Sequence, residues 1–286
     1  MTTTTTSPDL AAHAPVDHAP VDHATGAGYV TAALQSAKRT VLQFFRTPQL
    51  LMLGTIQGAL FLFMFRYIFG GAIHPGEGLD YVDFLVPGYL VTGILWLGMS
   101  AASGVAEDAA TGVHDRLRSL PIPRSSVMLG RSLADAALTL WGLVIAGVLA
   151  FIVGFRLQAD VAEVALALML VLFAVYSFMW VFITIGLTSG SAQAAQGTAT
   201  LLIVPLAFVS AALVPTDTLP GWMQPVADNQ PFTIVTNAVR SLTLGGTDAV
   251  GLGHSTAYWV ALSLAWCAGI LTVFGTLAVT RFARRA

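Results

Sequence analysis

The chain has 286 residues, of which 56% are hydrophobic and only 10% charged, and its mean hydropathy is +0.75. Soluble domains carry about 25% charged residues, so this composition excludes a water-soluble globular protein and requires lipid to cover much of the surface. The net charge is −2, and the sequence has no long basic run or basic-aromatic stripe that could bind nucleic acid. The single cysteine, Cys267, excludes an internal disulfide.

Residues 1–35 differ in composition from the rest of the chain. They contain five consecutive threonines and then repeat the sequence His-Ala-Pro-Val-Asp at residues 13–17 and 18–22. Histidines five residues apart, at His13, His18 and His23, could hold a metal ion, but a proline-interrupted, alanine-rich sequence is typical of disorder. We therefore predict a disordered cytoplasmic tail without a metal site, followed by one membrane domain over residues 36–286.

The membrane domain contains six windows that are long and apolar enough to cross a bilayer, which requires about 20 apolar residues per helix. The windows are Gln49–Phe69, Phe84–Ala106, Ser132–Phe155, Val164–Leu187, Gly197–Val214 and Ser255–Thr280. The fifth window is the shortest and contains Pro205, and the sixth has no charged residue. The predicted fold class is therefore an all-α membrane protein with six transmembrane helices.

The distribution of Lys and Arg predicts the orientation of these helices. With the N-terminus inside, the inner segments hold ten basic residues and the outer ends hold three. The inner ones are Lys38, Arg39, Arg46, Arg116, Arg118, Arg124, Arg131, Arg281, Arg284 and Arg285, and the outer ones are Arg66, Arg156 and Arg240. Cytoplasmic segments of membrane proteins carry the excess of Lys and Arg, so both termini are predicted to face the cytoplasm.

The inner connection between the second and third windows, Glu107–Arg131, predicts an amphipathic helix along the cytoplasmic membrane surface. Apolar residues recur here at spacings of three and four: Val105, Ala109, Val113, Leu117 and Leu120. The charged residues of this segment lie outside the apolar stripe: Glu107, Asp108, Asp115, Arg116 and Arg118. The pattern alone fits two interpretations equally well. The segment could be a connector that lies on the lipid surface, or it could be a docking surface for a cytoplasmic partner.

The outer connection, Pro215–His254, predicts two short helices between the fifth and sixth windows. Trp222 lies in an apolar stretch and suits the membrane interface. Pro231 opens a second stretch, in which apolar residues recur at helical spacing as far as Leu242. Such helices can dip into the outer leaflet only where protein or water protects their backbone.

Two kinds of catalysis are disfavoured by the sequence. A P-loop requires a lysine after a glycine-rich turn, and Lys38, the only lysine, has no such turn before it. The chain is therefore expected neither to hydrolyse ATP nor to bind a cofactor of its own. A serine protease that pairs Ser189 with His254 is disfavoured because the two residues fall on opposite membrane faces, about 30 Å apart.

Ion-coupled transport is also disfavoured, because carriers of that class need ionisable groups at membrane depth. Asp135 is the one acidic residue just inside a window, and it follows Arg131 by four residues. This spacing predicts a local structural ion pair at the inner interface. Transport by this chain would then take its energy from a partner.

A set of short motifs occurs in order over roughly residues 40–282. They are Phe84-Leu85-Val86-Pro87-Gly88, Glu107-Asp108, Gly112-Val113-His114-Asp115-Arg116-Leu117-Arg118-Ser119-Leu120-Pro121, Gly130-Arg131 with Asp135, Val214-Pro215-Thr216, Leu219-Pro220-Gly221-Trp222, and Asn229-Gln230-Pro231-Phe232-Thr233 with Arg240. Together they resemble the type-2 ABC permeases, most of all the daunorubicin-resistance branch of drug-export permeases in actinobacteria.

The resemblance implies the membrane-spanning permease subunit of an ATP-driven exporter in a bacterial plasma membrane, with a hydrophobic or amphiphilic drug, antibiotic or lipid as cargo. Two permeases, identical or sister chains, would bind two copies of a separate ATP-binding subunit that uses ATP and Mg²⁺. The inner amphipathic helix would be the coupling helix that meets this subunit. Its contact residues would be Glu107, Asp108, Asp115, Arg116, Arg118, Ser119, Leu120 and Pro121.

The resemblance also implies that the outer short helices cap the extracellular end of a pathway between two permeases. The cap residues would be Leu219, Trp222, Asn229, Pro231 and Arg240. The candidate wall residues of the pathway are Phe61, Phe65, Trp96 and Phe208. Apolar and aromatic walls suit a cargo that enters from the membrane. Two alternatives stay open: a permease for a lipid-linked glycan or polysaccharide, and a membrane partner that regulates an ATPase without transport.

Overall fold

The computed structural model of the chain describes residues 29–46, 48–71, 79–112, 124–213, 215–247 and 251–284. Every regular element in these ranges is a helix, so the predicted all-α fold class is confirmed for this part of the chain. The elements are α1 (Tyr29–Phe45), α2 (Pro48–Met64), the π-helix η1 (Phe65–Phe69), α3 (Tyr81–Ala110), α5 (Arg124–Val153), α6 (Val161–Thr188), α7 (Ala192–Phe208), the 3-10 helix η2 (Thr216–Thr218), α8 (Gln224–Asn229), α9 (Pro231–Thr243) and α10 (Thr256–Arg284).

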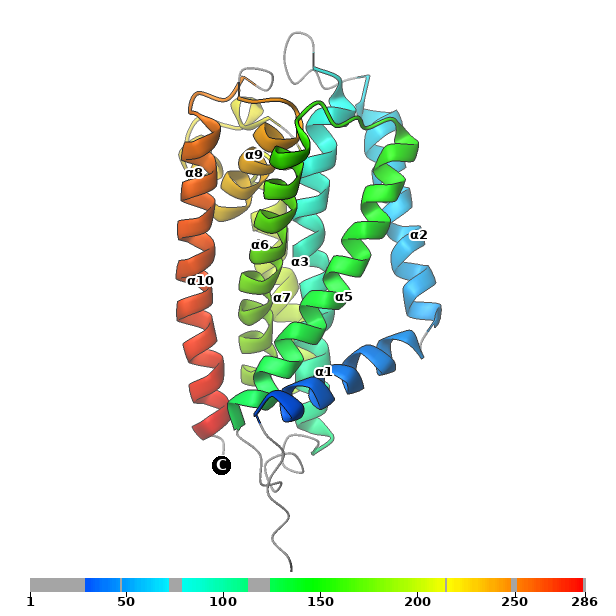
Figure 1. The fold of residues 1–286 in the computed structure, drawn as a ribbon, viewed down its shortest axis with the longest axis vertical. Coiled ribbons are helices and arrows are strands. Elements are labelled where there is room, and N and C mark those ends of the chain that lie inside the picture. Colours follow the sequence, from blue (N-terminus) through cyan, green and yellow to red (C-terminus); the bar gives the residue numbers. More distant parts are fainter. Residues whose placement is uncertain are drawn as a thin grey trace, which may run out of the picture.

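The long helices form an upright bundle with short helices at its two ends (Figure 1). In this bundle α3 packs against α5, α6, α7 and α9, and α6 also packs against α10. α1 crosses the lower end of the bundle obliquely and packs mainly against α5, whereas α9 lies at the upper end. The last turn of α10 lies at the lower end, as α1 does (Figure 1).

Four helices are long and apolar enough to cross a membrane: Tyr81–Ala110, Met128–Val153, Val161–Thr188 and Thr256–Phe282. They coincide with the second, third, fourth and sixth predicted windows. The first and fifth windows fall on two shorter apolar helices, Thr55–Ile68 and Ala192–Phe208. α7 has 17 residues and is about 26 Å long, which is less than the hydrocarbon core of about 30 Å.

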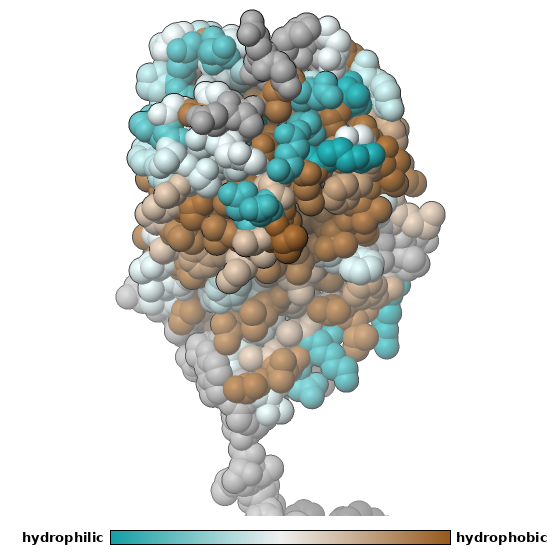
Figure 2. All heavy atoms as spheres, turned by 45° about the horizontal axis from the view of Figure 1, so that its top comes forward, coloured by the Kyte–Doolittle hydropathy of each residue, from teal (hydrophilic) through white to brown (hydrophobic). Residues whose placement is uncertain are grey.

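The surface of the bundle is apolar around its middle. Figure 2 shows a broad hydrophobic band below a hydrophilic rim at the upper end. Exposed apolar side chains come from several helices, among them Leu60 of α2, Ile152 of α5, Met169 of α6, Leu201 of α7 and Val273 of α10. Exposing such a band to water is unfavourable, so the bundle fits a hydrocarbon environment, and the chain is a multi-pass membrane protein.

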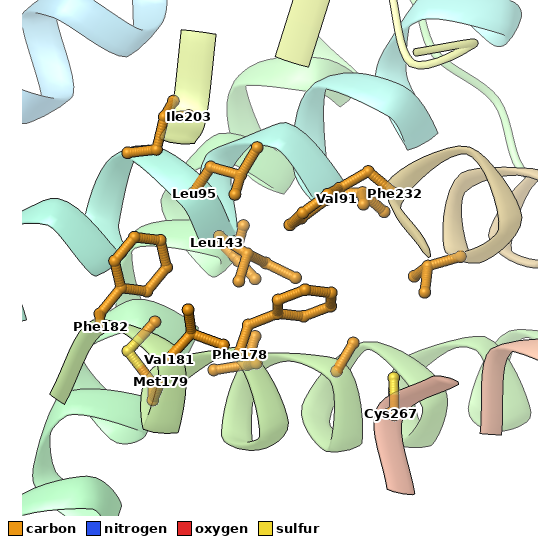
Figure 3. Packing of buried hydrophobic residues seen from close by; sticks show 14 of the residues in the cluster. Val91, Leu95, Leu143, Phe178, Met179, Val181, Phe182, Ile203, Phe232 and Cys267 are labelled. Atoms are coloured by element: carbon orange, nitrogen blue, oxygen red, sulfur yellow. The ribbon is translucent and has the colours of Figure 1, made fainter. Parts of the chain in front are cut away.

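The main buried core lies where α3, α6, α7, α9 and α10 meet (Figure 3). Phe178 of α6 and Phe232 of α9 lie with their ring centroids 4.4 Å apart, and Leu95 of α3 belongs to the same cluster. Cys267 of α10 is a buried free thiol in this cluster. Every residue of α9 from Phe232 to Thr243 is buried, so this short helix is part of the core rather than a surface cover.

The structure differs from the sequence prediction at the N-terminal boundary. α1 begins at Tyr29, so residues 29–35, which were assigned to the disordered tail, are helical. Ala33 is buried on the bundle side of α1, whereas Val30 and Leu34 are exposed. This division is typical of an amphipathic helix, which gains stability from packing that composition alone does not reveal.

The fifth helix also differs from its predicted window. α7 begins at Ala192, stabilised by the hydroxyl of Ser191, which accepts a hydrogen bond from the N–H of Ala194. It ends at Phe208 rather than Val214, and Pro205 lies inside its last turn. The residues that follow, 209–213, form an irregular segment at the upper end of the bundle.

Candidate functional site

The polar contacts between helices are concentrated at two opposite ends of the apolar bundle. At the lower end, four charged side chains form what we call the inner ion-pair cluster: Arg39 of α1, Asp108 of α3, and Arg131 and Asp135 of α5. Asp108 Oδ2 accepts hydrogen bonds from Arg131 Nη1 at 2.7 Å and from Arg39 Nη2 at 3.0 Å. Arg131 Nε donates to Asp135 Oδ2, also at 2.7 Å. The structure thus contains the predicted Arg131–Asp135 pair and extends it to α1 and α3.

The inner ion-pair cluster balances two cations with two anions. The side chains of Arg131, Asp108 and Asp135 are only 12%, 14% and 5% exposed, whereas that of Arg39 is 41% exposed. Burying a charge is costly unless it is paired and hydrogen-bonded, so the three buried members depend on one another. Arg39 lies closer to water and contributes a weaker, screened bond.

Two glycines allow the helices to meet at this cluster. A Cβ at Gly104 of α3 would lie 2.6 Å from Nη2 of Arg131, so only glycine leaves the guanidinium in its present place. A Cβ at Gly130 of α5 would lie 2.2 Å from the carbonyl oxygen of Ala33 in α1. The Gly130-Arg131 motif therefore combines close helix packing with an interhelical cation.

The predicted inner amphipathic helix requires a correction. Val105 and Ala109 belong to α3, which continues through Glu107 and Asp108 to Ala110. Gly112 then adopts φ = +71°, a left-handed conformation that favours glycine and ends the helix. A single helix from residue 105 to residue 120 is thus interrupted at Gly112.

The predicted contacts with an ATP-binding subunit are only partly within the described residues. Glu107 is exposed on the last turns of α3, whereas the carboxylate of Asp108 is engaged in the inner ion-pair cluster. The other six predicted contact residues lie outside the described ranges: Asp115, Arg116, Arg118, Ser119, Leu120 and Pro121. Their role stays a prediction.

At the upper end, side chains satisfy the backbone of the irregular segment after α7. Gln230 Nε2 donates to the carbonyl oxygens of Leu206 at 3.0 Å and Val209 at 2.6 Å. The N–H of Ala211 donates to Oγ1 of Thr233 at 3.0 Å. Buried backbone groups must find such partners, above all where no water is present.

Two further side chains complete what we call the outer polar cluster: Tyr81, Gln230, Thr233 and Arg240. Tyr81 donates its hydroxyl hydrogen to the carbonyl oxygen of Leu213 at 3.2 Å. Arg240 donates from Nη2 to the carbonyl oxygen of Ala212 and from Nε to that of Phe84, both at 2.9 Å. One arginine of α9 thus joins the irregular segment to the first turn of α3.

Arg240 is only 1% exposed, and the ion pairs of the described residues provide it with no carboxylate. Its guanidinium carbon lies 3.6 Å from the ring centroid of Phe84, a cation–π contact. Burial lowers the pKa of Arg240 to about 9, which still leaves the group charged at neutral pH. Gly88 makes the close approach possible, since a Cβ there would lie 1.6 Å from the carbonyl oxygen of Ala212.

The predicted cap residues occupy different environments. Pro231 is the first residue of α9, and Asn229 is the exposed last residue of α8. Leu219 is half-buried, whereas Trp222 is 78% exposed. Arg240 is buried inside the bundle, and the role of these residues in a cap stays a prediction.

The predicted pathway residues also divide into two groups. Trp96 and Phe208 are 36% and 57% exposed, so both present surface to the surroundings of this chain. Phe61 is half-buried, and its ring lies tilted against that of Phe65 with the centroids 4.6 Å apart. Phe65 itself is only 7% exposed, so its ring packs inside the chain, and the wall role of the four residues stays a prediction.

Sequence reasoning missed the partners that complete each cluster. Arg39 was counted only as an inner positive charge, although the exposed apolar residues of α1, such as Val30, Leu34 and Leu42, recur at a helical period that could have revealed the helix. Gln230 and Thr233 lie in one of the quoted motifs, but the sequence does not indicate which groups they or Tyr81 bond, since these are backbone atoms far away in the sequence. Both clusters connect helices through charges and hydrogen bonds, an arrangement that fixes relative helix positions rather than breaking covalent bonds.

Comparison with known proteins identifies relatives of the chain. The sequence model of the family described as ABC-2 type transporter matches residues 31–244, which include both polar clusters. The chain is 29% identical over 250 residues to the daunorubicin resistance ABC transporter permease protein DrrB1 of Streptomyces coeruleorubidus, covering 87% of this chain and 84% of the relative.

Two other relatives have names of the same kind. The probable doxorubicin resistance ABC transporter permease protein DrrC of Mycobacterium tuberculosis is 22% identical over 252 residues, with 86% of each chain covered. The putative transport permease ycf38 of Cyanophora paradoxa is 27% identical over 218 residues, covering 72% of this chain and 71% of the relative. The similarity thus extends along most of each chain rather than a single motif.

Proposed function

The chain belongs to the ABC-2 type transporter family, and we propose that it is the permease subunit of an ATP-driven exporter of hydrophobic or amphiphilic compounds. The observation that carries the proposal is the family match over residues 31–244, together with similarity to a daunorubicin resistance permease along 87% of the chain. The apolar band and the all-helical bundle support a membrane-spanning subunit.

The proposed topology has six crossings, with both termini in the cytoplasm. α3, α5, α6 and α10 supply four crossings, and the continuous helical run through α2 and η1 supplies the first. α7 supplies the fifth, and the irregular segment stabilised by the outer polar cluster completes its path to the outer surface. The excess of Lys and Arg at the end occupied by α1 supports this orientation.

ATP hydrolysis would occur on a separate ATP-binding subunit. The segment that follows Gly112 would receive the movement of that subunit, as the resemblance implies for Asp115, Arg116, Arg118, Ser119, Leu120 and Pro121. Asp108 lies one helical turn before Gly112 and is bonded to both Arg39 and Arg131. A displacement of the end of α3 would therefore be transmitted to α1 and α5 together. This is a population shift between two arrangements of the same helices.

The cargo is proposed to be an amphiphilic aromatic compound such as an anthracycline, because two relatives are named for resistance to daunorubicin or doxorubicin. The exposed aromatic residues Trp96 and Phe208 would face it at the junction with a second permease, a copy of this chain or a sister chain. Planar aromatic compounds suit such walls.

The decisive experiment is transport in inverted membrane vesicles that contain the chain together with its proposed ATP-binding partner subunit. We expect ATP-dependent accumulation of doxorubicin, followed by its fluorescence. Vesicles with the chain alone, and vesicles whose ATP-binding subunit lacks its catalytic carboxylate, should not accumulate the compound. ATP-driven transfer of a lipid-linked glycan instead would establish the first alternative, and altered ATPase activity without any transport would establish a regulatory partner.

A further inference from the structure

The exposed surface of α1 has two flanks of opposite character. Val30, Leu34 and Phe45 are exposed and recur at helical spacing, so they form an apolar flank. Arg39 and Arg46 are also exposed, seven residues apart, and lie on a different side of the helix, which we call the basic flank. The N–H of Arg46 donates to the carbonyl oxygen of Leu42, so the helical turn continues as far as this arginine.

Two contacts fix how α1 is rotated about its own axis. The ring of Phe45 lies 6.0 Å from that of Trp141, an exposed residue of α5. Trp141 lies ten residues beyond Arg131 in α5, which is about 15 Å further from the lower end of the bundle. Arg39 instead donates to Asp108, on the last turns of α3. The apolar flank is therefore turned toward the apolar band of the bundle, and the basic flank toward its lower end.

The connection to α2 holds α1 at the membrane surface. α1 ends at Phe45, and α2, which begins the proposed first crossing, starts at Pro48. Three residue steps reach at most about 11 Å, so α1 cannot leave the surface of the bilayer. The helix also crosses the lower end of the bundle obliquely rather than standing upright (Figure 1). A helix with an apolar and a basic flank in this position suits the boundary between hydrocarbon and lipid headgroups.

The basic flank has charge to offer to such headgroups. α1 contains no acidic residue, and Arg46 takes part in none of the ion pairs of the described residues. The third basic residue, Lys38, lies at the edge of the apolar flank. Arg39 is paired with Asp108 alone, through one nitrogen, although a guanidinium has five N–H donors. An exposed ion pair and the attraction of one arginine to an anionic membrane surface are similarly weak, so a headgroup phosphate can compete with Asp108.

We propose that the basic flank of α1 binds anionic phospholipid headgroups of the cytoplasmic leaflet, and that these headgroups compete with Asp108 for Arg39. In a membrane poor in anionic lipid, Arg39 joins α1 to α3. In a membrane rich in it, Arg39 turns to a phosphate, and Asp108 keeps only its bond to Arg131. The charge of the surrounding lipid thus sets how firmly α1 is attached to the inner ion-pair cluster. The inference rests on the orientation given under the proposed function but requires no ATP-binding subunit.

The proposal is tested by native mass spectrometry of the purified full-length chain, titrated with phosphatidylglycerol or phosphatidylcholine. Arg46→Gln and Arg39→Gln should each lower the preference for phosphatidylglycerol about fivefold, because each removes one charge from the basic flank. Asp108→Asn should instead raise the preference about threefold, because Arg39 then has no competing carboxylate. Arg156→Gln is the matched control, since it removes an exposed arginine at the other end of the bundle and should leave the preference unchanged.

Equal binding of the two lipids to the unaltered chain, or equal losses in Arg46→Gln and Arg156→Gln, would overturn the headgroup site. An unchanged or lowered preference in Asp108→Asn would overturn the competition for Arg39. Crosslinking from position 35, which is exposed beside the basic flank, provides a second readout in membranes. Crosslinks to phospholipid are expected, whereas crosslinks to protein alone would show that a partner chain covers the flank. Since neither readout involves transport, a failure of the lipid site is distinguishable from a failure of the proposed exporter function.

Discussion

At the inner end of the bundle four charged side chains join three helices, whereas at the outer end one arginine joins α9 to α3 through backbone carbonyl groups. The inner bonds link flexible side chains, and one partner, Arg39, is 41% exposed. The outer bonds end on backbone atoms in a buried environment. The bond of the exposed Arg39 can therefore break at small cost, whereas the buried inner pairs and the buried backbone contacts of Arg240 cannot.

The difference suggests a division of roles within one bundle. We expect the outer end to hold its geometry while the inner end changes arrangement during the transport cycle. The position of the inner ion-pair cluster, one turn before the segment that would meet the ATP-binding subunit, agrees with this expectation. Four pairs of variants, taken from the largest expected effect to the smallest, separate the two roles.

Arg240→Met is expected to have the largest effect on stability. It removes two charge-assisted hydrogen bonds and leaves the carbonyl oxygen of Ala212 without its partner, for a loss of about 3–5 kcal/mol. The measurement is the free energy of unfolding in mixed micelles. Arg156→Met is the matched control, because Arg156 is an exposed arginine and its loss should change stability by less than about 1 kcal/mol. Similar losses for both variants would refute a special role for Arg240.

Gly88→Ala and Gly104→Ala compare the two ends by adding the same methyl group. At Gly88 the new Cβ meets a backbone oxygen at 1.6 Å, whereas at Gly104 it meets the end of the Arg131 side chain at 2.6 Å. Backbone cannot move aside as a side chain can, so we expect a loss of about 3 kcal/mol at Gly88 and less than about 1 kcal/mol at Gly104. Unfolding in mixed micelles measures both, and equal losses would contradict a rigid outer end.

Asp108→Asn is expected to affect transport more than stability. The change removes the charge shared by Arg39 and Arg131, but Arg131 keeps Asp135, so the stability loss should be about 1–2 kcal/mol. ATP-dependent accumulation in vesicles should fall at least fivefold at equal membrane insertion. Glu107→Gln provides the neighbouring control, since Glu107 is exposed on the same turn. A larger transport defect in Glu107→Gln would indicate that α3 meets the ATP-binding subunit directly rather than through the cluster.

The helices themselves were largely predictable from the sequence, because apolar length and period are local properties. The windows of residues 84–106 and 164–187 lie within α3 and α6. The Arg131–Asp135 pair was predictable for the same reason, since its spacing fits one helical turn. Local sequence patterns thus predicted the helices and one ion pair within a single helix.

The contacts between elements were not predictable in this way. Asp108 was assigned to a surface helix, yet it lies 69 residues from Arg39 in the sequence and bonds to it across α1 and α3. Arg240 was assigned to an outer cap, but its carbonyl partner in Phe84 lies 156 residues away. Such pairings depend on which helices pack together, and a single sequence carries no direct record of that packing.

Arg39→Gln is expected to have the smallest effect on stability, and it tests the inner end most directly. Arg39 is 41% exposed, so its bond to Asp108 should contribute about 0–1 kcal/mol. That difference should disappear at high salt, because exposed charges are screened. Lys38→Gln, which removes an adjacent exposed charge on the same helix, is the matched control. If the inner end changes arrangement during transport, Arg39→Gln should clearly lower ATP-dependent transport, and Lys38→Gln should not. If both variants transport normally, α1 is an anchor held by its packing on Gly130, and movement at the inner end passes only between α3 and α5.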